Sequence, residues 1–539
     1  MDKYVKKKKE NSEVTGVTTF QVPSYTEAMK GSISISTSKP NNHLRKEIVN
    51  KALHFHAKGN ISEAAKYYQY FLDKGFNDPI VFSNYGMILK NFGKLEKAEI
   101  YLRKSIALKP DFANAYSNLG TILKELNKSE EAEIAYRKAI ELKPDFANAY
   151  YNLGNILKII GKLEEAELYL RKAIEIKPKF ANAYSNLGNI LNDLGKLKEA
   201  EVSLRKAIEL KPDLAEAYSN LGELVKELGR LKEAESLQIK AIKINPTIKT
   251  LKNNLINLLT IYKPKDINAN PLYMINEDFK RISLNIKENN LITDHEAVKI
   301  YQDGLEIYKN YNLDLETNLS QIYKRNDLNL NCKRHKLIFE KHKIIPEFCF
   351  GCYKVQVDLI SIVELIKLSL VLNNLKLKNN NTRKTMIELR NNIPGFYKGL
   401  IYCLSLEEAF EISNMLNIKI KKNIRSDLKS TVKRGCSEYS LEFPKYKEIR
   451  VSEDQPMNYN KSWKKIEEEI DKEKKEWGKS FANIEGFSLD SFLIIRNWIV
   501  YAQKLGDPSV NKLTKEIIKP PEWIINLISS RTKLKSKLN

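Results

Sequence analysis

All five cysteines of the chain lie between positions 332 and 436, and two of its six histidines lie among them. Cys332 and His335 are three residues apart, and Cys349 and Cys352 form a C-x-x-C pair. Such spacings let two side chains of one segment bind one metal ion, and four nitrogen and sulfur ligands suit tetrahedral zinc. Cys332, His335, Cys349 and Cys352 are therefore candidate zinc ligands. Cysteine is also a common small residue of protein cores, so burial without a metal is the alternative.

The elements that would position these residues are predicted from the hydrophobic pattern. Strands are expected at 349–359, 384–390, 397–404 and 431–443, and helices at 360–375 and 405–416. The order βαββαβ is typical of a ferredoxin-like α+β domain. In the strand order 4-1-3-2 expected for that arrangement, Cys403 would lie near Cys349, and Cys436 would lie on the other neighbouring strand.

Other catalytic patterns are absent from the sequence. It has no Walker loop, no G-x-S-x-G turn, no His-x-Asp pair and no three-cysteine cluster of the radical type. A redox role for the C-x-x-C pair is disfavoured, because no helix start that would lower a thiol pKa is predicted there. Whether the chain is an enzyme stays open, and the sequence favours a protein without catalytic activity.

The part of the sequence before this region repeats itself from Pro79 to Pro246. Each unit is expected to form two helices, roughly 148–161 and 162–177 in the third copy, and to end at a proline that cannot continue the helix. Neighbouring units must stack, because one helical hairpin cannot bury its apolar face alone. Three columns recur every 34 residues: Gly86, Gly120, Gly154, Gly188 and Gly222; Ala98, Ala132, Ala166, Ala200 and Ala234; Pro110, Pro144, Pro178, Pro212 and Pro246.

These columns resemble the tetratricopeptide repeat (TPR) family, whose fold is an α-solenoid, a right-handed superhelix of helical hairpins. The third copy has the TPR pattern Tyr150, Leu153-Gly154, Leu157, Ala166, Leu170, Ala173 and Pro178. Gly154 and Ala166 are both small, so the two backbones of a hairpin are expected to approach closely. A degenerate unit upstream and a capping helix within 249–262 extend the TPR superhelix to six units plus a cap over 45–262.

Asparagines recur on the helices that would line the concave groove of this superhelix. They occupy three columns: Asn84, Asn118, Asn152, Asn186 and Asn220; Asn114, Asn148 and Asn182; Asn155 and Asn189. An amide has both a donor and an acceptor, so such a ladder can pair with the backbone of an extended peptide. The alternative is that TPR sequences favour asparagine at these positions for local contacts.

The asparagine columns are similar to the asparagine ladder of the TPR superhelix in O-linked N-acetylglucosamine transferases. That resemblance implies a peptide-binding groove. Residues 263–539 do not resemble the two-lobed glycosyltransferase half of those proteins, so the resemblance implies no transferase activity for this chain.

The rest of the chain is assigned from composition and pattern. We expect disorder at 1–44, a helical linker region at 263–345, the α+β domain at 346–445 and extra C-terminal helices at 446–539. The net charge of +23 is spread along the chain, and no nucleic-acid-binding module is recognisable. No secretory signal or membrane-length apolar segment is visible, so we expect a cytoplasmic protein with reduced thiols.

We predict that the chain is a scaffold that binds an extended peptide or a partner protein in the TPR groove. The first alternative is a protein-modifying enzyme whose repeats recruit the substrate. The second alternative is a nucleic-acid-binding protein that uses the basic C-terminal domain. No membrane partner is expected, and nucleic acid is the less favoured ligand.

Overall fold

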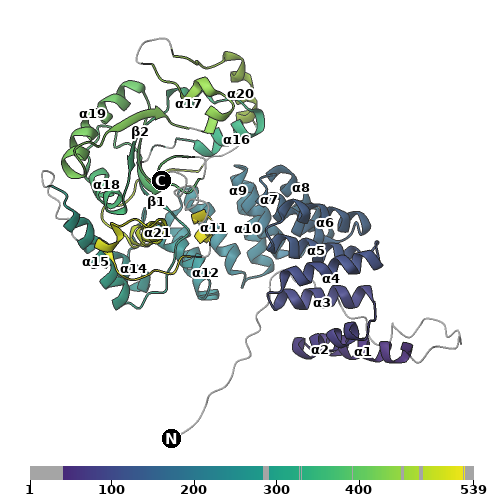
Figure 1. Cartoon of the computed structure of the whole chain (residues 1–539). Coiled ribbons are helices and arrows are strands. Elements are labelled where there is room, and N and C mark those ends of the chain that lie inside the picture. The colour runs from purple at the N-terminus through teal and green to yellow at the C-terminus, as the bar shows by residue number, and fades with distance from the viewer. Residues whose placement is uncertain are drawn as a thin grey trace, which may run out of the picture. The chain divides into compact units, whose positions relative to one another are not determined.

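The computed structural model describes residues 41–282, 291–326, 328, 330–390, 393–436, 438–450, 455–472, 478–521, 523–525 and 527–528. The chain forms two compact units, Met1–Leu194 and Gly195–Asn539 (Figure 1). The disorder predicted at 1–44 falls mostly on residues 1–40, which lie outside the described residues. The first helix begins at Asn41, inside that predicted segment.

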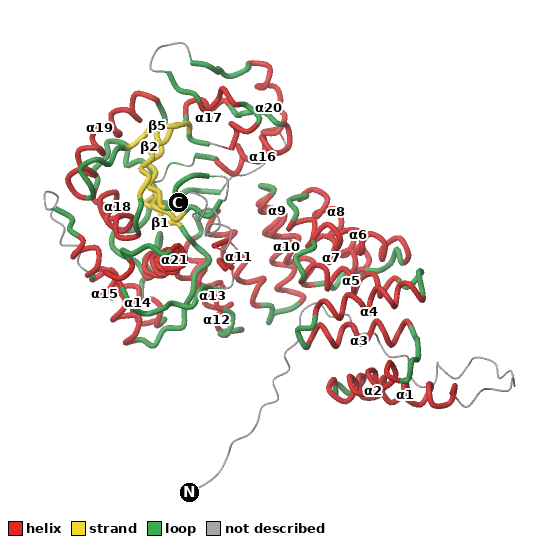
Figure 2. The backbone as a smooth tube through the Cα atoms, viewed as in Figure 1, coloured by secondary structure: helices red, strands yellow, loops and turns green. Residues whose placement is uncertain are grey.

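The first unit is built from consecutive helical pairs, drawn in red in Figure 2. Its helices are α1 (Asn41–Ala57), α2 (Ile61–Asp73), α3 (Pro79–Asn91), α4 (Leu95–Leu108), α5 (Ala113–Glu125), α6 (Ser129–Leu142), α7 (Ala147–Ile159), α8 (Leu163–Ile176) and α9 (Ala181–Asp193). Contacts join the two helices of each pair, and they join each second helix to the first helix of the next pair. This is the arrangement of stacked hairpins that the 34-residue period predicts.

The third pair shows why glycine and alanine recur in columns. A Cβ added at Gly154 would lie 2.8 Å from Cγ of Leu170 and 3.3 Å from the carbonyl oxygen of Ala166. The expected approach of Gly154 to the backbone at Ala166 is therefore present. The side chain of Leu170, which sequence analysis did not name for this contact, lies closer still. Gly161 closes the turn between α7 and α8 with a φ of +84°, a conformation that glycine adopts without strain.

The first helices of successive pairs lie on the inside of the stack in the first unit. α3 contacts α5, α5 contacts α7 and α7 contacts α9, whereas the second helices of successive pairs make fewer such contacts. A stack whose helices approach each other more closely on one side curves towards that side. The asparagine columns of the first unit belong to these first helices.

The second unit begins with helices of the same hairpin pattern and continues into an α+β part. α11 packs on α12, and α12 packs on α13. The helices before the sheet are α10 (Leu197–Leu210), α11 (Ala215–Glu227), α12 (Leu231–Ile244), α13 (Lys249–Leu258), α14 (Pro271–Arg281) and α15 (Asp294–Asn310). The later helices are α16 (Cys332–His342), α17 (Glu347–Gly351), α18 (Ile362–Asn374), α19 (Leu406–Asn423), α20 (Lys464–Lys472), α21 (Leu489–Leu505) and α22 (Val510–Leu513).

An antiparallel sheet of five strands lies in the second unit, in the order β1-β3-β4-β2-β5. The strands are β1 (Gln321–Lys324), β2 (Tyr353–Leu359), β3 (Arg383–Ile387), β4 (Tyr397–Cys403) and β5 (Ser430–Arg434). β2 to β5 correspond to the four predicted strands and are neighbours in the expected order, and α18 and α19 pack on them and on each other. β1 is an additional edge strand, and the ferredoxin-like class of this part of the chain stays a prediction.

All four predicted strands are shorter than expected, the first and the fourth most clearly. The first begins at Tyr353, because the residues before it form α17, where the N–H of Cys349 donates to the carbonyl oxygen of Pro346 at 2.9 Å. The fourth ends at Arg434, and a short 3₁₀ helix follows at Glu438–Leu441. Cys349 therefore lies on a helix instead of a strand.

Helix α21 lies at the centre of the second unit, where it contacts α13, α14, β1 and β3. Trp498 is fully buried, and its Nε1 donates to the carbonyl oxygen of Ser320 at 2.8 Å. Nδ2 of Asn497 donates to the carbonyl oxygen of Thr317 at 2.8 Å. These bonds fix the segment that leads into β1. None of the helices in the described ranges is long and apolar enough to cross a membrane.

Candidate functional site

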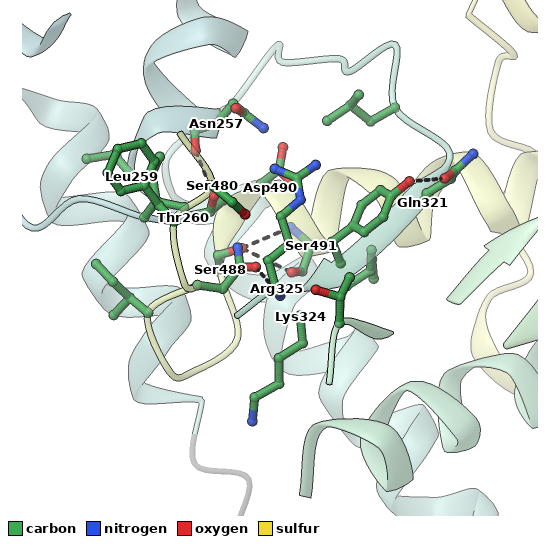
Figure 3. A pocket seen from close by; sticks show the side chains of 18 of the residues that line it. Asn257, Leu259, Thr260, Gln321, Lys324, Arg325, Ser480, Ser488, Asp490 and Ser491 are labelled. Carbon is green, nitrogen blue, oxygen red and sulfur yellow. Dashed lines mark hydrogen bonds between the residues drawn. The ribbon is translucent and has the colours of Figure 1, made fainter. Parts of the chain in front are cut away.

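A cavity of about 1160 Å³ lies within the second unit, where the last repeat helices meet the α+β part (Figure 3). Its first wall is formed by α11 and α13, its second by β1 and adjoining residues, and its third by residues within 478–491. Small-molecule sites usually have volumes of about 300–1,000 Å³. The cavity therefore has room for a ligand larger than a single side chain.

The wall formed by α11 and α13 continues the repeat columns. Asn254 lies 34 residues after Asn220, and Asn257 lies one repeat after a glutamate of α11. Nδ2 of Asn254 donates to Oγ of Ser219 at 2.8 Å. Oδ1 of Asn253 is buried and has no hydrogen-bond partner among the described residues. Amide groups thus line the cavity at positions equivalent to those of the predicted ladder.

Hydrogen bonds hold the third wall against the other two. The N–H of Ile484 donates to the carbonyl oxygen of Thr260 at 2.8 Å, which joins the wall to the residues after α13. The N–H of Arg325 donates to Oδ1 of Asn483 at 2.7 Å, which joins the wall to the end of β1. The three walls are therefore connected through both main-chain and side-chain atoms.

Asp490 lies in the first turn of α21 and lines the cavity. Its exposed fraction is 9%, and its carboxylate makes no hydrogen bond or ion pair with any described residue. Burial raises the pKa of Asp490 from 3.8 to about 6, although the positive charges of Arg325 and Lys226 act in the opposite direction. The start of α21 is capped by Ser488, whose Oγ accepts from the N–H of Ser491 at 3.1 Å. Asp490 is therefore not the N-cap of its helix.

The cations beside Asp490 have other contacts. Lys226 forms an ion pair with Glu223, and its Nζ also donates to Oδ1 of Asn257 at 3.3 Å. The guanidinium of Arg325 lies over the ring of Tyr323, 4.6 Å from the ring centroid. Neither cation reaches Asp490 as an ion pair, so the charge of this carboxylate is not neutralised by direct contact within the described part of the chain.

Two of the predicted ladder residues are used inside the repeats. Asn84 and Asn118 are both 4% exposed. Nδ2 of Asn84 donates to the hydroxyl of Tyr68 at 3.3 Å, and Nδ2 of Asn118 donates to Oγ of Ser83 at 3.2 Å. At this end of the column, the asparagines connect neighbouring helices.

The remaining ladder residues are half-buried. Nδ2 of Asn186 donates to the hydroxyl of Tyr151 at 3.1 Å and to Oδ1 of Asn155 at 2.7 Å. The side chain of Asn152 makes no hydrogen bond to any residue in the ranges that the structure describes. The others in this half-buried state are Asn114, Asn148, Asn182, Asn189 and Asn220.

The predicted zinc ligands lie on α16 and at α17. Cys332 is exposed at the start of α16, and the buried ring of His335 stacks on Phe348 with ring centroids 5.1 Å apart. Cys349 is buried, and its Sγ lies 3.6 Å from the hydroxyl of Tyr439. His335 and Cys349 thus have aromatic neighbours.

The buried thiols lie among apolar and aromatic groups. Burial raises the pKa of Cys352 to about 12 and that of Cys403 to about 12. A hydrogen bond with Cys436, together with burial, raises the pKa of Cys349. Over the described ranges, no group of three or more His, Cys, Asp or Glu side chains is placed to hold a metal ion. The zinc site stays a prediction from sequence and has no part in the function proposed below.

Sequence analysis did not single out Asn254, Asn257, Arg325 or Asp490. Extending the 34-residue period by one more unit would have identified Asn254 and Asn257 as equivalents of ladder positions. No local pattern marks Asp490, because an acidic residue in the first turn of a helix is ordinary.

Comparison with known proteins identifies the repeats. A family model described as TPR repeat matches residues 120–158 and 188–229. Three models described as tetratricopeptide repeat also match: the first at 147–180, the second at 101–134 and 169–202, and the third at 81–112 and 215–248. A search of curated protein sequences found no match.

Each of three similar solved structures covers about a third of the chain. YrrB, described as a TPR protein with an unusual peptide-binding site, is 25% identical, with a TM-score of 0.30, over 35% of this chain and 98% of its own. MamA is 25% identical, with a TM-score of 0.28, over 30% of this chain and 94% of its own. A thermophilic TPR protein of Thermus thermophilus, TTC0263, is 23% identical, with a TM-score of 0.31, over 34% of this chain and 99% of its own. The segment within residues 81–248 therefore consists of tetratricopeptide repeats.

Proposed function

We propose that the repeats bind a partner protein through an extended peptide segment that lies along the first helices α5, α7 and α9. The supporting observation is the state of Asn152, in the middle of the asparagine column. Its amide is half-buried and makes no hydrogen bond to a described residue, whereas Asn84 and Asn118 of the same column are buried and bonded. An amide offers a donor and an acceptor, which are the two groups that a peptide backbone needs.

Recognition of this kind is directed at the backbone of the ligand. Asn148 and Asn182 are also half-buried, and they lie on the same first helices as the central column. Packed helices lie about 8–10 Å apart, and an extended chain rises about 3.3 Å per residue. Amides on successive helices can therefore bind main-chain groups at about every third residue of the ligand, whatever its side chains are. A scaffold that binds partner proteins needs this tolerance, and its specificity must come from other contacts.

The experiment begins with affinity purification of the full chain and mass spectrometry, which identifies a partner. The partner's affinity is then measured for the wild type and for a triple variant, Asn148→Ala, Asn152→Ala and Asn182→Ala. A hydrogen bond contributes about 0.5–1.5 kcal/mol net. We therefore expect the triple variant to bind at least about tenfold more weakly, since 1.4 kcal/mol corresponds to a factor of ten.

The matched control is Asn310→Ala, because Asn310 is an exposed asparagine at the end of α15 in the other unit. This variant should bind the partner like the wild type, and circular dichroism should show unchanged helix content for all variants. Unchanged affinity of the correctly folded triple variant would contradict the proposal. The enzymatic and nucleic-acid-binding alternatives stay predictions from the sequence.

A further inference from the structure

We propose that the cavity between α11, α13, β1 and residues 478–491 receives a basic side chain of a peptide ligand, and that Asp490 pairs with the ammonium or guanidinium group of that side chain. This inference rests on the proposed peptide-binding function and adds a specificity site to it. All residues of the site lie within the unit Gly195–Asn539.

The burial of Asp490 is not explained by its place in a helix. The helix dipole stabilises a carboxylate in the first turn at the exposed surface as well, so it does not require the carboxylate to be buried. Asp490 is 9% exposed and has no partner in the described part of the chain. Removing an ionised carboxylate from water without a partner is costly. A partner supplied by a ligand would offset that cost.

The neighbouring cations leave room for such a ligand. Lys226 is already neutralised by Glu223, and Arg325 lies over the Tyr323 ring. Arg325 is exposed, and its guanidinium forms no ion pair with a described residue, so it can donate to peptide carbonyl oxygens. The carboxylate of Asp490 is left for a cationic group.

The chemistry of the first wall favours a peptide over a free amine. Oδ1 of Asn253 is buried without a partner among the described residues, and Asn254 is one repeat beyond Asn220 in the predicted ladder. These amides can bind main-chain groups next to the basic residue. The volume of about 1160 Å³ accommodates a segment of chain together with its side chain.

The test uses the full-length protein and a positional-scanning library of heptapeptides. The central position is Lys, Arg, Gln, norleucine or Glu, and binding is measured by fluorescence polarisation. Lys and Arg peptides should bind at least tenfold more tightly than norleucine and Gln peptides. The variant Asp490→Asn keeps the shape of the side chain and removes its charge, so it should abolish this preference.

The charge-matched control is Glu306→Gln, because Glu306 is an exposed carboxylate on α15 and does not line the cavity. It should keep the preference for basic peptides. Equal affinity for all peptides would overturn the inference and leave the proposed peptide binding intact. Tight binding of Gln peptides would do the same, because it would indicate that the site takes a neutral hydrogen-bond donor. Failure of every peptide to bind would overturn the proposed function and the inference with it. If Asp490→Asn does not fold, the inference is tested by the affinities of the Lys and norleucine peptides for the wild type. Equal affinities would overturn it.

Discussion

The N–H of Lys479 donates to the carbonyl oxygen of Glu227 at 2.7 Å, which joins the loop before α21 to the end of α11. The two residues are far apart in the sequence and lie on either side of the boundary predicted at position 262. Within the second unit, the last repeat helices and the α+β part therefore share hydrogen bonds. Glu227 and Lys479 both line the cavity that contains Asp490.

Asp490→Asn should stabilise the protein in a pH-dependent way. The raised pKa of Asp490, about 6 against 3.8, means that the folded state binds the proton more tightly than the unfolded state between these values. Stability is therefore lost as the pH rises from about 4 to about 6. One pKa unit corresponds to about 1.4 kcal/mol, so the variant should gain up to about 3 kcal/mol above pH 6.

Urea unfolding of the wild type and of Asp490→Asn from pH 4 to pH 8 measures this effect. The gain of the variant should grow up to about pH 6 and then stay constant. Arg325 and Lys226 are the charged groups that act on Asp490. A gain that does not change with pH would show that Asp490 is not a buried ionised group.

Gly154→Val should destabilise the first unit. Any Cβ at this position meets Cγ of Leu170 at 2.8 Å, and this atom cannot move without displacing the rest of the side chain. Overpacking of this kind costs about 1–3 kcal/mol. Thermal unfolding followed by circular dichroism measures the loss. Glu164→Val, at an exposed position of α8, is the control and should change stability by less than about 1 kcal/mol.

Glu133→Gln should reduce stability in a manner that depends on salt and pH. Glu133 accepts hydrogen bonds from Arg137 at 2.8 Å and from Lys162 at 3.0 Å, and Arg137 also reaches Glu165 at 2.7 Å. Burial acts to raise the pKa of Glu133, but the bonds from Arg137 and Lys162 outweigh it and lower the pKa. The ion pairs therefore stabilise the fold above the ordinary glutamate pKa, and this contribution is lost as the pH falls below it.

The expected cost of Glu133→Gln is about 0.2–1 kcal/mol for each ion pair at low salt. It should shrink in 1 M NaCl, where charges are screened within about 3 Å. Urea unfolding at two salt concentrations measures the difference. A cost that is equal at both concentrations would indicate lost packing instead of lost electrostatic attraction.

The thiols should differ in their reactivity. Cys332 is exposed, whereas Cys349, Cys352 and Cys403 are buried. We expect iodoacetamide to label Cys332 in the folded protein and to label these three buried thiols only after unfolding, as mass spectrometry of peptides can show. Rapid labelling of Cys352 or Cys403 in the native state would contradict their placement in the core.

The repeats were predictable because their signal is periodic. Gly154 is required by its contact with Leu170, sixteen residues later in the same hairpin. Gly86, Gly120 and Gly222 face the side chain sixteen residues later in the same way, so the sequence repeats the requirement. Packing between neighbours in the sequence leaves such a pattern. The helices of the first unit accordingly lie where the period of 34 residues places them.

The α+β part was predictable in outline only. β1 has four residues, too few for an alternating pattern to show, and its pairing with β3 depends on residues far along the chain. Cys349 has a strand-like sequence around it, but its N–H bonds to Pro346 within the short helix α17. Short elements are decided by tertiary contacts more than by local propensity.

Asp490 could not be predicted from its neighbours in sequence. Its burial depends on walls contributed by α11, α13 and β1, which precede it by more than a hundred residues. The sequence shows only an acidic residue in the first turn of a helix. The folded structure is needed to show that this carboxylate is buried and has no partner among the described residues. Sites formed by such distant segments leave no local signal.

The exposed outer face of the repeats offers a rival surface for peptide binding. Ile100, Ile134 and Leu168 recur every 34 residues on the second helices and are 53%, 68% and 64% exposed. If peptides bind this apolar column, the asparagines of the first helices are structural. The two surfaces can be distinguished by a crosslinker placed on one or the other.

Photo-crosslinking tests the central claim most directly. p-Benzoylphenylalanine is introduced at position 158 on α7 or at position 168 on α8. Each protein is irradiated with a fluorescein-labelled peptide from the partner protein that affinity purification identifies. The account predicts label transfer to the protein modified at 158 and none above background to the protein modified at 168. Transfer at 168 without transfer at 158 would contradict peptide binding along the first helices.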